Sequence, residues 1–161
     1  RARVFVEQAE AAPPEDATSW RAAKAAVEQA ATFARGEADS HPQIVELLAR
    51  VRAGDAQAQR DRALLDWLSG NWLQLAYDLR LGSEGLDAEF TKALLEWGLD
   101  VVALDVDTAA ATIRGSKIRV QVVSGLDRLV EYLWPKETAA SPEVALSRKI
   151  AAIAMAADRD P

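Results

Sequence analysis

Apolar residues recur three and four positions apart along most of this chain, which is the spacing of one face of an α-helix. The longest run of this kind lies between residues 47 and 79, and only Gly54 and Asp61 interrupt it. A seam that alternates four and three positions apart over about four heptads is typical of a coiled-coil face. We therefore predict one long helix over residues 42–80, which could bend at Gly54 or at residues 69–71, because glycine weakens a helix. A break at Gly70 is the main alternative. The seam consists of Leu47, Val51, Gly54, Ala58, Asp61, Leu65, Leu68, Trp72, Leu75 and Leu79.

A short helix is predicted at the start of the chain. Residues 1–12 show helical spacing at Val4, Phe5, Gln8, Ala9 and Ala12. Pro13 and Pro14 end this helix, because proline lacks the backbone N–H that a helix interior requires.

An alanine-rich helix comes next. Thr18 or Ser19 is the predicted N-cap, and Gly36 is the predicted end of the helix. Small side chains along one face allow a partner helix to approach closely. We therefore expect this helix to pack antiparallel on the first half of the long helix. Its stripe consists of Trp20, Ala23, Val27, Ala30 and Ala34.

Several shorter helices are predicted in the second half of the chain, after a loop at residues 81–85. Pro142 suits the first turn of the last helix. Four residues whose side chains favour helix N-caps mark the predicted starts: Asp87, Asp107, Ser116 and Ser141. The apolar positions at helical spacing are Phe90, Leu94, Trp97, Ile118, Val122, Leu126, Leu129, Leu133, Val144, Leu146, Ile150, Ile153 and Ala157.

The stretch "EWGLDVVALDVD", residues 96–107, allows two interpretations. As a strand it would have no partner strand, so its backbone donors and acceptors would stay unsatisfied. We therefore favour a connector between two helices, in which Gly98 ends the first helix in the left-handed conformation. Asp100 and Asp105 are then turn and capping residues. Three apolar residues are expected to hold this joint in place by packing against the core: Leu99, Val102 and Leu104.

The predicted fold class is all-α. An antiparallel helical hairpin with one long helix, residues 1–80, leads into a compact bundle of shorter helices, residues 86–161. We expect the two regions to pack as one unit. A chain of 161 residues is long enough to bury such a core without disulfides or metals.

The composition of the chain disfavours several classes of function. The net charge of −6 disfavours a nucleic-acid binder, which would carry a basic surface. No apolar run approaches the roughly 20 residues of a membrane span. The absence of cysteine excludes thiolate metal sites and suits a reducing compartment, so we expect a cytoplasmic protein. The chain begins at Arg1 and ends in "DRDP", which leads us to expect a piece of a longer polypeptide.

A divalent metal site is the alternative interpretation of the joint. Asp100, Asp105 and Asp107 could supply the oxygen ligands that Mg²⁺ or Ca²⁺ requires, as in a small metal-dependent hydrolase. Their spacing matches no known cation-binding loop, and the glycine of the EF-hand loop is missing. We expect no bound metal and no cofactor.

Other candidate sites have weaker signals. His41 is the only histidine and lies at a helix start, where a surface or capping role is common. Ser116 or Ser124 as a nucleophile would need a base and an oxyanion hole, and no motif provides them. Arg114 and Lys117 belong to a modest basic cluster, so a helical regulatory domain that binds a small anion is a further alternative.

Trp67 is the candidate interaction residue. It lies off the seam of the long helix, whereas Trp72 and Trp97 lie on core stripes. A tryptophan outside the core pattern is a candidate contact for another helix or a partner chain.

Part of the chain resembles a known family of multidomain proteins. The stretch "ATSWRAAKAAVEQAATFARG", the "RDR" of the long helix, "WGLDVVAL", "AATIR" and "IRVQVVSGLD" are similar to the helical region that follows the kinase domain in planctomycete-type bacterial serine/threonine protein kinases. The resemblance covers roughly residues 15–130. It implies a spacer and scaffold between a kinase domain and tetratricopeptide-type repeats. The chain has no Gly-rich nucleotide loop, "HRD" or "DFG", so it implies no kinase catalysis here.

These observations lead us to expect a non-catalytic helical interaction or spacer region of a larger kinase. The expected partners are proteins, either adjacent helical repeats or a second copy of the chain. Neither nucleic acid nor a membrane is an expected partner.

Overall fold

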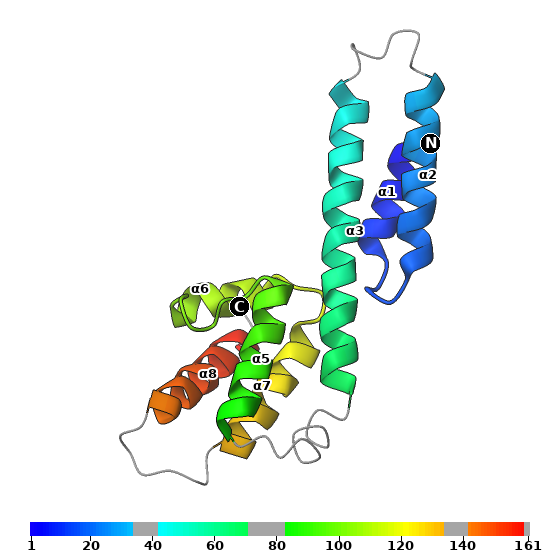
Figure 1. Ribbon diagram of the computed structural model, residues 1–161. Coiled ribbons are helices and arrows are strands. Elements are labelled where there is room, and N and C mark those ends of the chain that lie inside the picture. Colours follow the sequence, from blue (N-terminus) through cyan, green and yellow to red (C-terminus); the bar gives the residue numbers. More distant parts are fainter. Residues whose placement is uncertain (34–41, 71–82, 134–141, 160–161) are drawn as a thin grey trace. The chain divides into compact units, whose positions relative to one another are not determined.

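The computed structural model describes residues 1–33, 42–70, 83–133 and 142–159. These residues contain seven helices and no β-strand, so the fold is all-α as predicted (Figure 1). The helices are α1 (Ala2–Ala11), α2 (Ala17–Phe33), α3 (Pro42–Ser69), α5 (Ser83–Trp97), α6 (Val106–Arg114), α7 (Arg119–Leu133) and α8 (Pro142–Asp158).

The chain divides into two compact units, residues 1–62 and residues 63–161, which we call unit 1 and unit 2. The division falls inside α3. The predicted division of the chain at residues 80–86 stays a prediction, because residues 71–82 lie outside the described residues. The predicted continuation of the long helix from Gly70 to residue 80 lies outside them for the same reason.

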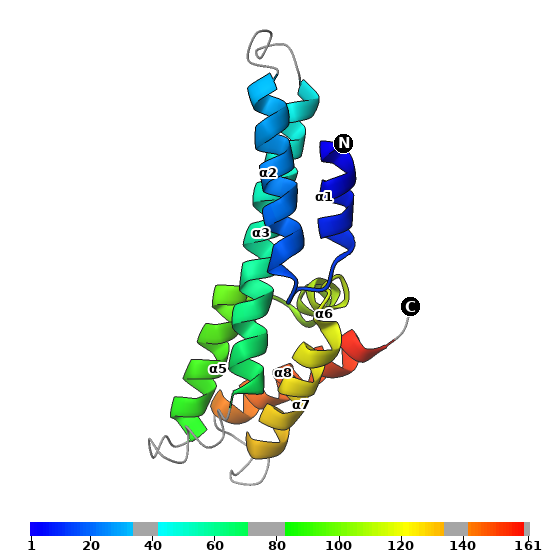
Figure 2. The same ribbon diagram turned by 90° about the vertical axis from the view of Figure 1, so that its right-hand side faces the viewer.

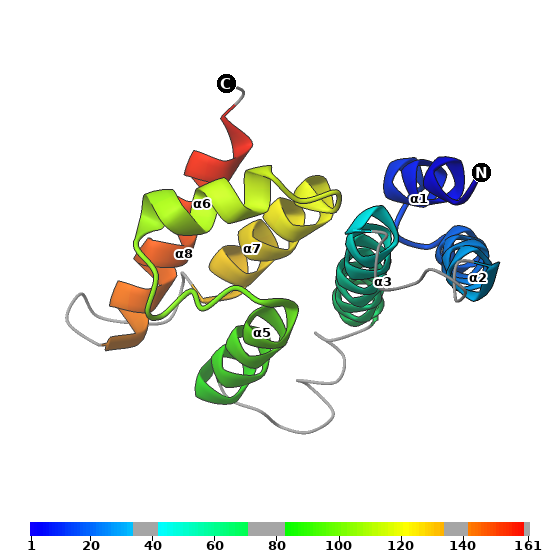
Figure 3. The same ribbon diagram turned by 90° about the horizontal axis from the view of Figure 1, so that it is seen from above.

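Unit 1 consists of α1, α2 and the first part of α3. Seen from above, the three helices lie at the corners of a triangle, and α2 runs opposite to α3 (Figures 1 and 3). Figure 2 shows α1 alongside α2. The shared core consists mainly of small and β-branched side chains around one tryptophan: Val6, Ala9, Trp20, Ala23, Val27, Val51 and Ala58.

The predicted seam of α3 is largely confirmed. Val51, Ala58 and Leu68 are buried. Gly54 lies under the Trp20 ring so closely that a Cβ at this position would overlap with Cη2 of Trp20. The seam is therefore continuous through Gly54 because an aromatic ring fills the space that the missing side chain leaves.

Two positions of the α3 seam differ from the simple apolar pattern. Asp61 is buried and accepts a hydrogen bond from Nε2 of Gln57 at 2.8 Å, as a buried carboxylate requires. Leu64 is buried, whereas the predicted seam residue Leu65 is only partly buried. Leu65 nevertheless packs against the core of unit 2.

Two predictions for the first helices were wrong in detail. Helix α1 forms and buries Ala9 of the predicted pattern, but its other buried residue is Val6, whereas Val4 and Phe5 are exposed. The N-cap of α2 is Asp16, not Thr18 or Ser19. Oδ1 of Asp16 accepts the backbone N–H groups of both those residues, which satisfies two donors at the helix start.

Unit 2 contains a larger core of leucine, isoleucine and aromatic side chains. Helix α8 packs against α6 and α7. The predicted apolar positions of α5, α7 and α8 are buried wherever the structure describes their side chains, except Leu146, which is partly buried. The largest fully buried side chains of this unit are Phe90, Leu94, Leu99, Ile113, Ile118, Leu126, Leu129, Ile150 and Ile153.

Three predicted helix starts in unit 2 were wrong. Helix α5 begins at Ser83, so Asp87 lies inside it and residues 83–85 are not a loop. Helix α6 is capped by Asp105, not Asp107. Helix α7 begins at Arg119, and the hydroxyl of Ser116 makes no hydrogen bond. Each predicted residue has a side chain suited to capping, but several such residues occur within a few positions and packing selects one. Pro142 begins α8 as predicted, and Ser141 lies outside the described residues.

Candidate interaction surface

The joint at residues 98–105 has the local structure of a connector between two helices. Gly98 has a φ of +113°, and the N–H groups of Gly98 and Leu99 donate to the carbonyls of Leu95 and Leu94 at 2.9 and 2.8 Å. These two bonds are those of a Schellman motif, in which glycine takes the left-handed position. The connector interpretation and the role of Gly98 are therefore confirmed.

Apolar residues anchor this joint, but the set differs from the predicted one. Leu99 and Val101 are fully buried and Leu104 is partly buried, whereas Val102 is 59 % exposed. The prediction of Val102 was wrong because the turn at residues 101–103 reverses which side chain faces the core. Nζ of Lys149 donates to the carbonyl of Val102 at 2.7 Å, which ties the joint to α8.

The three aspartates proposed for a metal site do not form one. Oδ1 of Asp100 accepts the backbone N–H groups of Val102 and Ala103 at 3.1 and 2.9 Å, which makes it a turn residue. Asp107 is exposed in the first turn of α6. In the ranges that the structure describes, no three His, Cys, Asp or Glu side chains are placed to hold a metal ion.

Asp105 is the N-cap of α6. Its carboxylate accepts the backbone N–H and the hydroxyl of Thr108 at 2.9 and 2.7 Å. The hydrogen bond from the Thr108 hydroxyl is the largest cause that lowers the pKa of Asp105 below its ordinary value of 3.8. The predicted turn and capping roles of Asp100 and Asp105 are thus confirmed, and both carboxylates are used within the fold.

The candidate cations lie at the end of α6 and in the turn after it, whereas Ser124 lies inside α7. Arg114 is in the last turn of α6, where a positive charge interacts favourably with the helix dipole. Lys117 is exposed in the turn that follows. Ser124 is exposed on α7, and no base hydrogen-bonds to the buried hydroxyl of Ser116. His41 lies outside the described residues.

Trp67 is partly buried in unit 2. Its ring packs edge-to-face on Phe90 of α5, with ring centroids 5.2 Å apart and an interplanar angle of 79°. This geometry is favourable for an aromatic pair. Trp67 therefore contacts another helix of its own chain, and its role toward a partner chain stays a prediction.

The outer surface of α1 carries apolar side chains that the fold does not bury. Val4 and Phe5 are adjacent and are 53 % and 41 % exposed. The same helix is attached to unit 1 through the buried Val6 and Ala9. Helix α1 thus exposes two apolar side chains to solvent among its polar ones.

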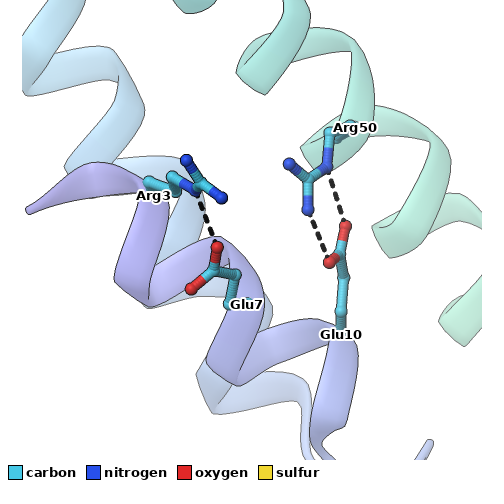
Figure 4. Close-up of polar contacts among 4 residues, drawn as sticks. All are labelled: Arg3, Glu7, Glu10 and Arg50. Carbon is cyan, nitrogen blue, oxygen red and sulfur yellow. Dashed lines mark hydrogen bonds and ion pairs between the residues drawn. The ribbon is translucent and has the colours of Figure 1, made fainter.

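Charged side chains form one ion pair within α1 and another between α1 and α3 (Figure 4). Nε of Arg3 lies 2.7 Å from a Glu7 carboxylate oxygen, one turn along α1. Glu10 receives two hydrogen bonds from Arg50 of α3, from Nε at 3.0 Å and from Nη2 at 2.7 Å. The hydrogen bond to Glu10 raises the pKa of the Arg50 guanidinium. A two-bonded pair of this kind specifies the orientation of the two groups.

A further hydrogen bond fixes the turn after α1. Nη1 of Arg62 in α3 donates to the carbonyl of Pro14 at 2.9 Å. Sequence reasoning missed both this bond and the Glu10–Arg50 pair. Their partners lie 48 and 40 positions apart, and no local pattern marks such pairs among the many charged residues.

Comparisons of the chain with models of known protein families, with curated proteins and with solved structures found no match. None of the helices in the described segments is both long and apolar enough to cross a bilayer.

Proposed function

We propose that this chain is a non-catalytic helical interaction segment that binds another helical protein surface. The observation that carries the proposal is the outer surface of α1, where Val4 and Phe5 are exposed beside charged residues. Apolar and aromatic side chains at the centre with a charged rim are the usual anatomy of a protein interface. Of the candidate metal ligands, Asp100 and Asp105, by contrast, serve as turn and capping residues.

The parent protein in this proposal is a bacterial serine/threonine kinase in the cytoplasm, in which the chain is a spacer and scaffold. This part of the proposal is supported only by the resemblance of residues 15–130 to the helical region of such kinases. It implies that the isolated chain does not hydrolyse ATP or transfer its phosphate.

Association of the full chain tests the proposal. We expect sedimentation velocity to show self-association, or binding to adjoining helical repeats of a parent kinase. Replacing Val4 by Lys and Phe5 by Glu should weaken that association at least about fivefold, because it places charges at the centre of the contact. The helical circular dichroism should be nearly unchanged, since both residues are exposed.

The matched control is Val120→Lys in α7, which charges an exposed apolar residue of unit 2. It should leave association unchanged. If the chain stays monomeric and does not bind the repeats, or if both variants lose association equally, the α1 surface is not an interface. Trp67→Glu is a poorer probe, because it would break the packing on Phe90 as well as any external contact.

A further inference from the structure

We draw no further inference here: the strongest candidate, the outer surface of α8 on which the exposed Met155 lies between Arg148 and Arg159, is a helix face for which nothing in the described part of the structure shows what covers it.

Discussion

The two units of this chain are stabilised in different ways. Unit 1 has a core of alanine and valine around the single aromatic ring of Trp20. Unit 2 buries Phe90, Trp97 and a set of leucine and isoleucine side chains. Hydrophobic stabilisation scales with the apolar area removed from water, so unit 2 should be the more stable of the two.

The close helix–helix contacts of the two units differ in whether α3 supplies the glycine or the large side chain. In unit 1, α3 supplies the glycine, and Trp20 of α2 lies over Gly54. In unit 2, α3 supplies the large side chain, and Leu68 lies over Gly125 of α7, where a Cβ would be 2.6 Å from Cδ2. The first contact involves a rigid ring and the second the end of a flexible side chain. The contact in unit 1 is therefore the less adaptable of the two.

This difference matters for the proposal made above. Local stability is not uniform within a protein, and elements that open come from its less stable parts. Helix α1 and its Glu10–Arg50 pair belong to unit 1, which we expect to be the less stable. The comparison of the two units can be tested by three experiments.

The largest effect is expected for Trp20→Ala. Removal of a buried tryptophan costs about 3–5 kcal/mol, a large part of what so small a core supplies. Hydrogen exchange followed by mass spectrometry should show loss of protection in α1 and α2, whereas α7 keeps its protection. The matched control is Phe33→Ala, because Phe33 is an aromatic residue of the same helix that is 83 % exposed. Equal loss of protection in both units would disprove their independence.

A smaller effect is expected for an added methyl group at the two glycines. Gly54→Ala forces the Trp20 ring to move and should cost about 1–3 kcal/mol, because overpacking displaces a rigid side chain. Gly125→Ala meets only the end of Leu68, and alanine favours the helix by up to about 1 kcal/mol, so its net effect should be near zero. Denaturant unfolding measures both. A larger loss for Gly125→Ala than for Gly54→Ala would reverse our ranking of the two contacts.

The smallest effect is expected on the loss of stability at acid pH, and it should be similar in the two units. Hydrogen bonds, chiefly from the Ser19 hydroxyl to Asp16 and from the Thr108 hydroxyl to Asp105, lower the pKa of each carboxyl below 3.8. A carboxyl with a lowered pKa stabilises the fold above its ordinary pKa, and this contribution is lost as the pH falls through the lowered value.

Asparagine caps a helix but does not titrate. Asp16→Asn and Asp105→Asn should therefore each reduce the fall in melting temperature between pH 5 and pH 2.5. The reduction should be about the same in both variants. Thermal melts by circular dichroism at a series of pH values measure this. An unchanged acid dependence in both variants would show that other carboxyls dominate.

Much of the fold could be predicted from the sequence. The helical periodicity, the stop at Pro13, the left-handed Gly98 and the start at Pro142 all depend on residues close in the chain. The buried stripes of α2 and α7 were predicted for the same reason. The candidate interaction surface could not be predicted, because Val4 and Phe5 have the spacing of core residues and only the packing of α1 shows that they face solvent.

By itself, the sequence determined the fold class, the approximate helices and the turn roles of Asp100 and Asp105, since the signals for these act over a few residues. Only the tertiary structure decided which of several neighbouring residues caps a helix, which face of α1 is buried, and that Arg50 pairs with Glu10. The physical reason is distance along the chain. Periodicity and capping are local, whereas burial and charge pairing depend on which helices meet, and many pairings satisfy the same local pattern equally well.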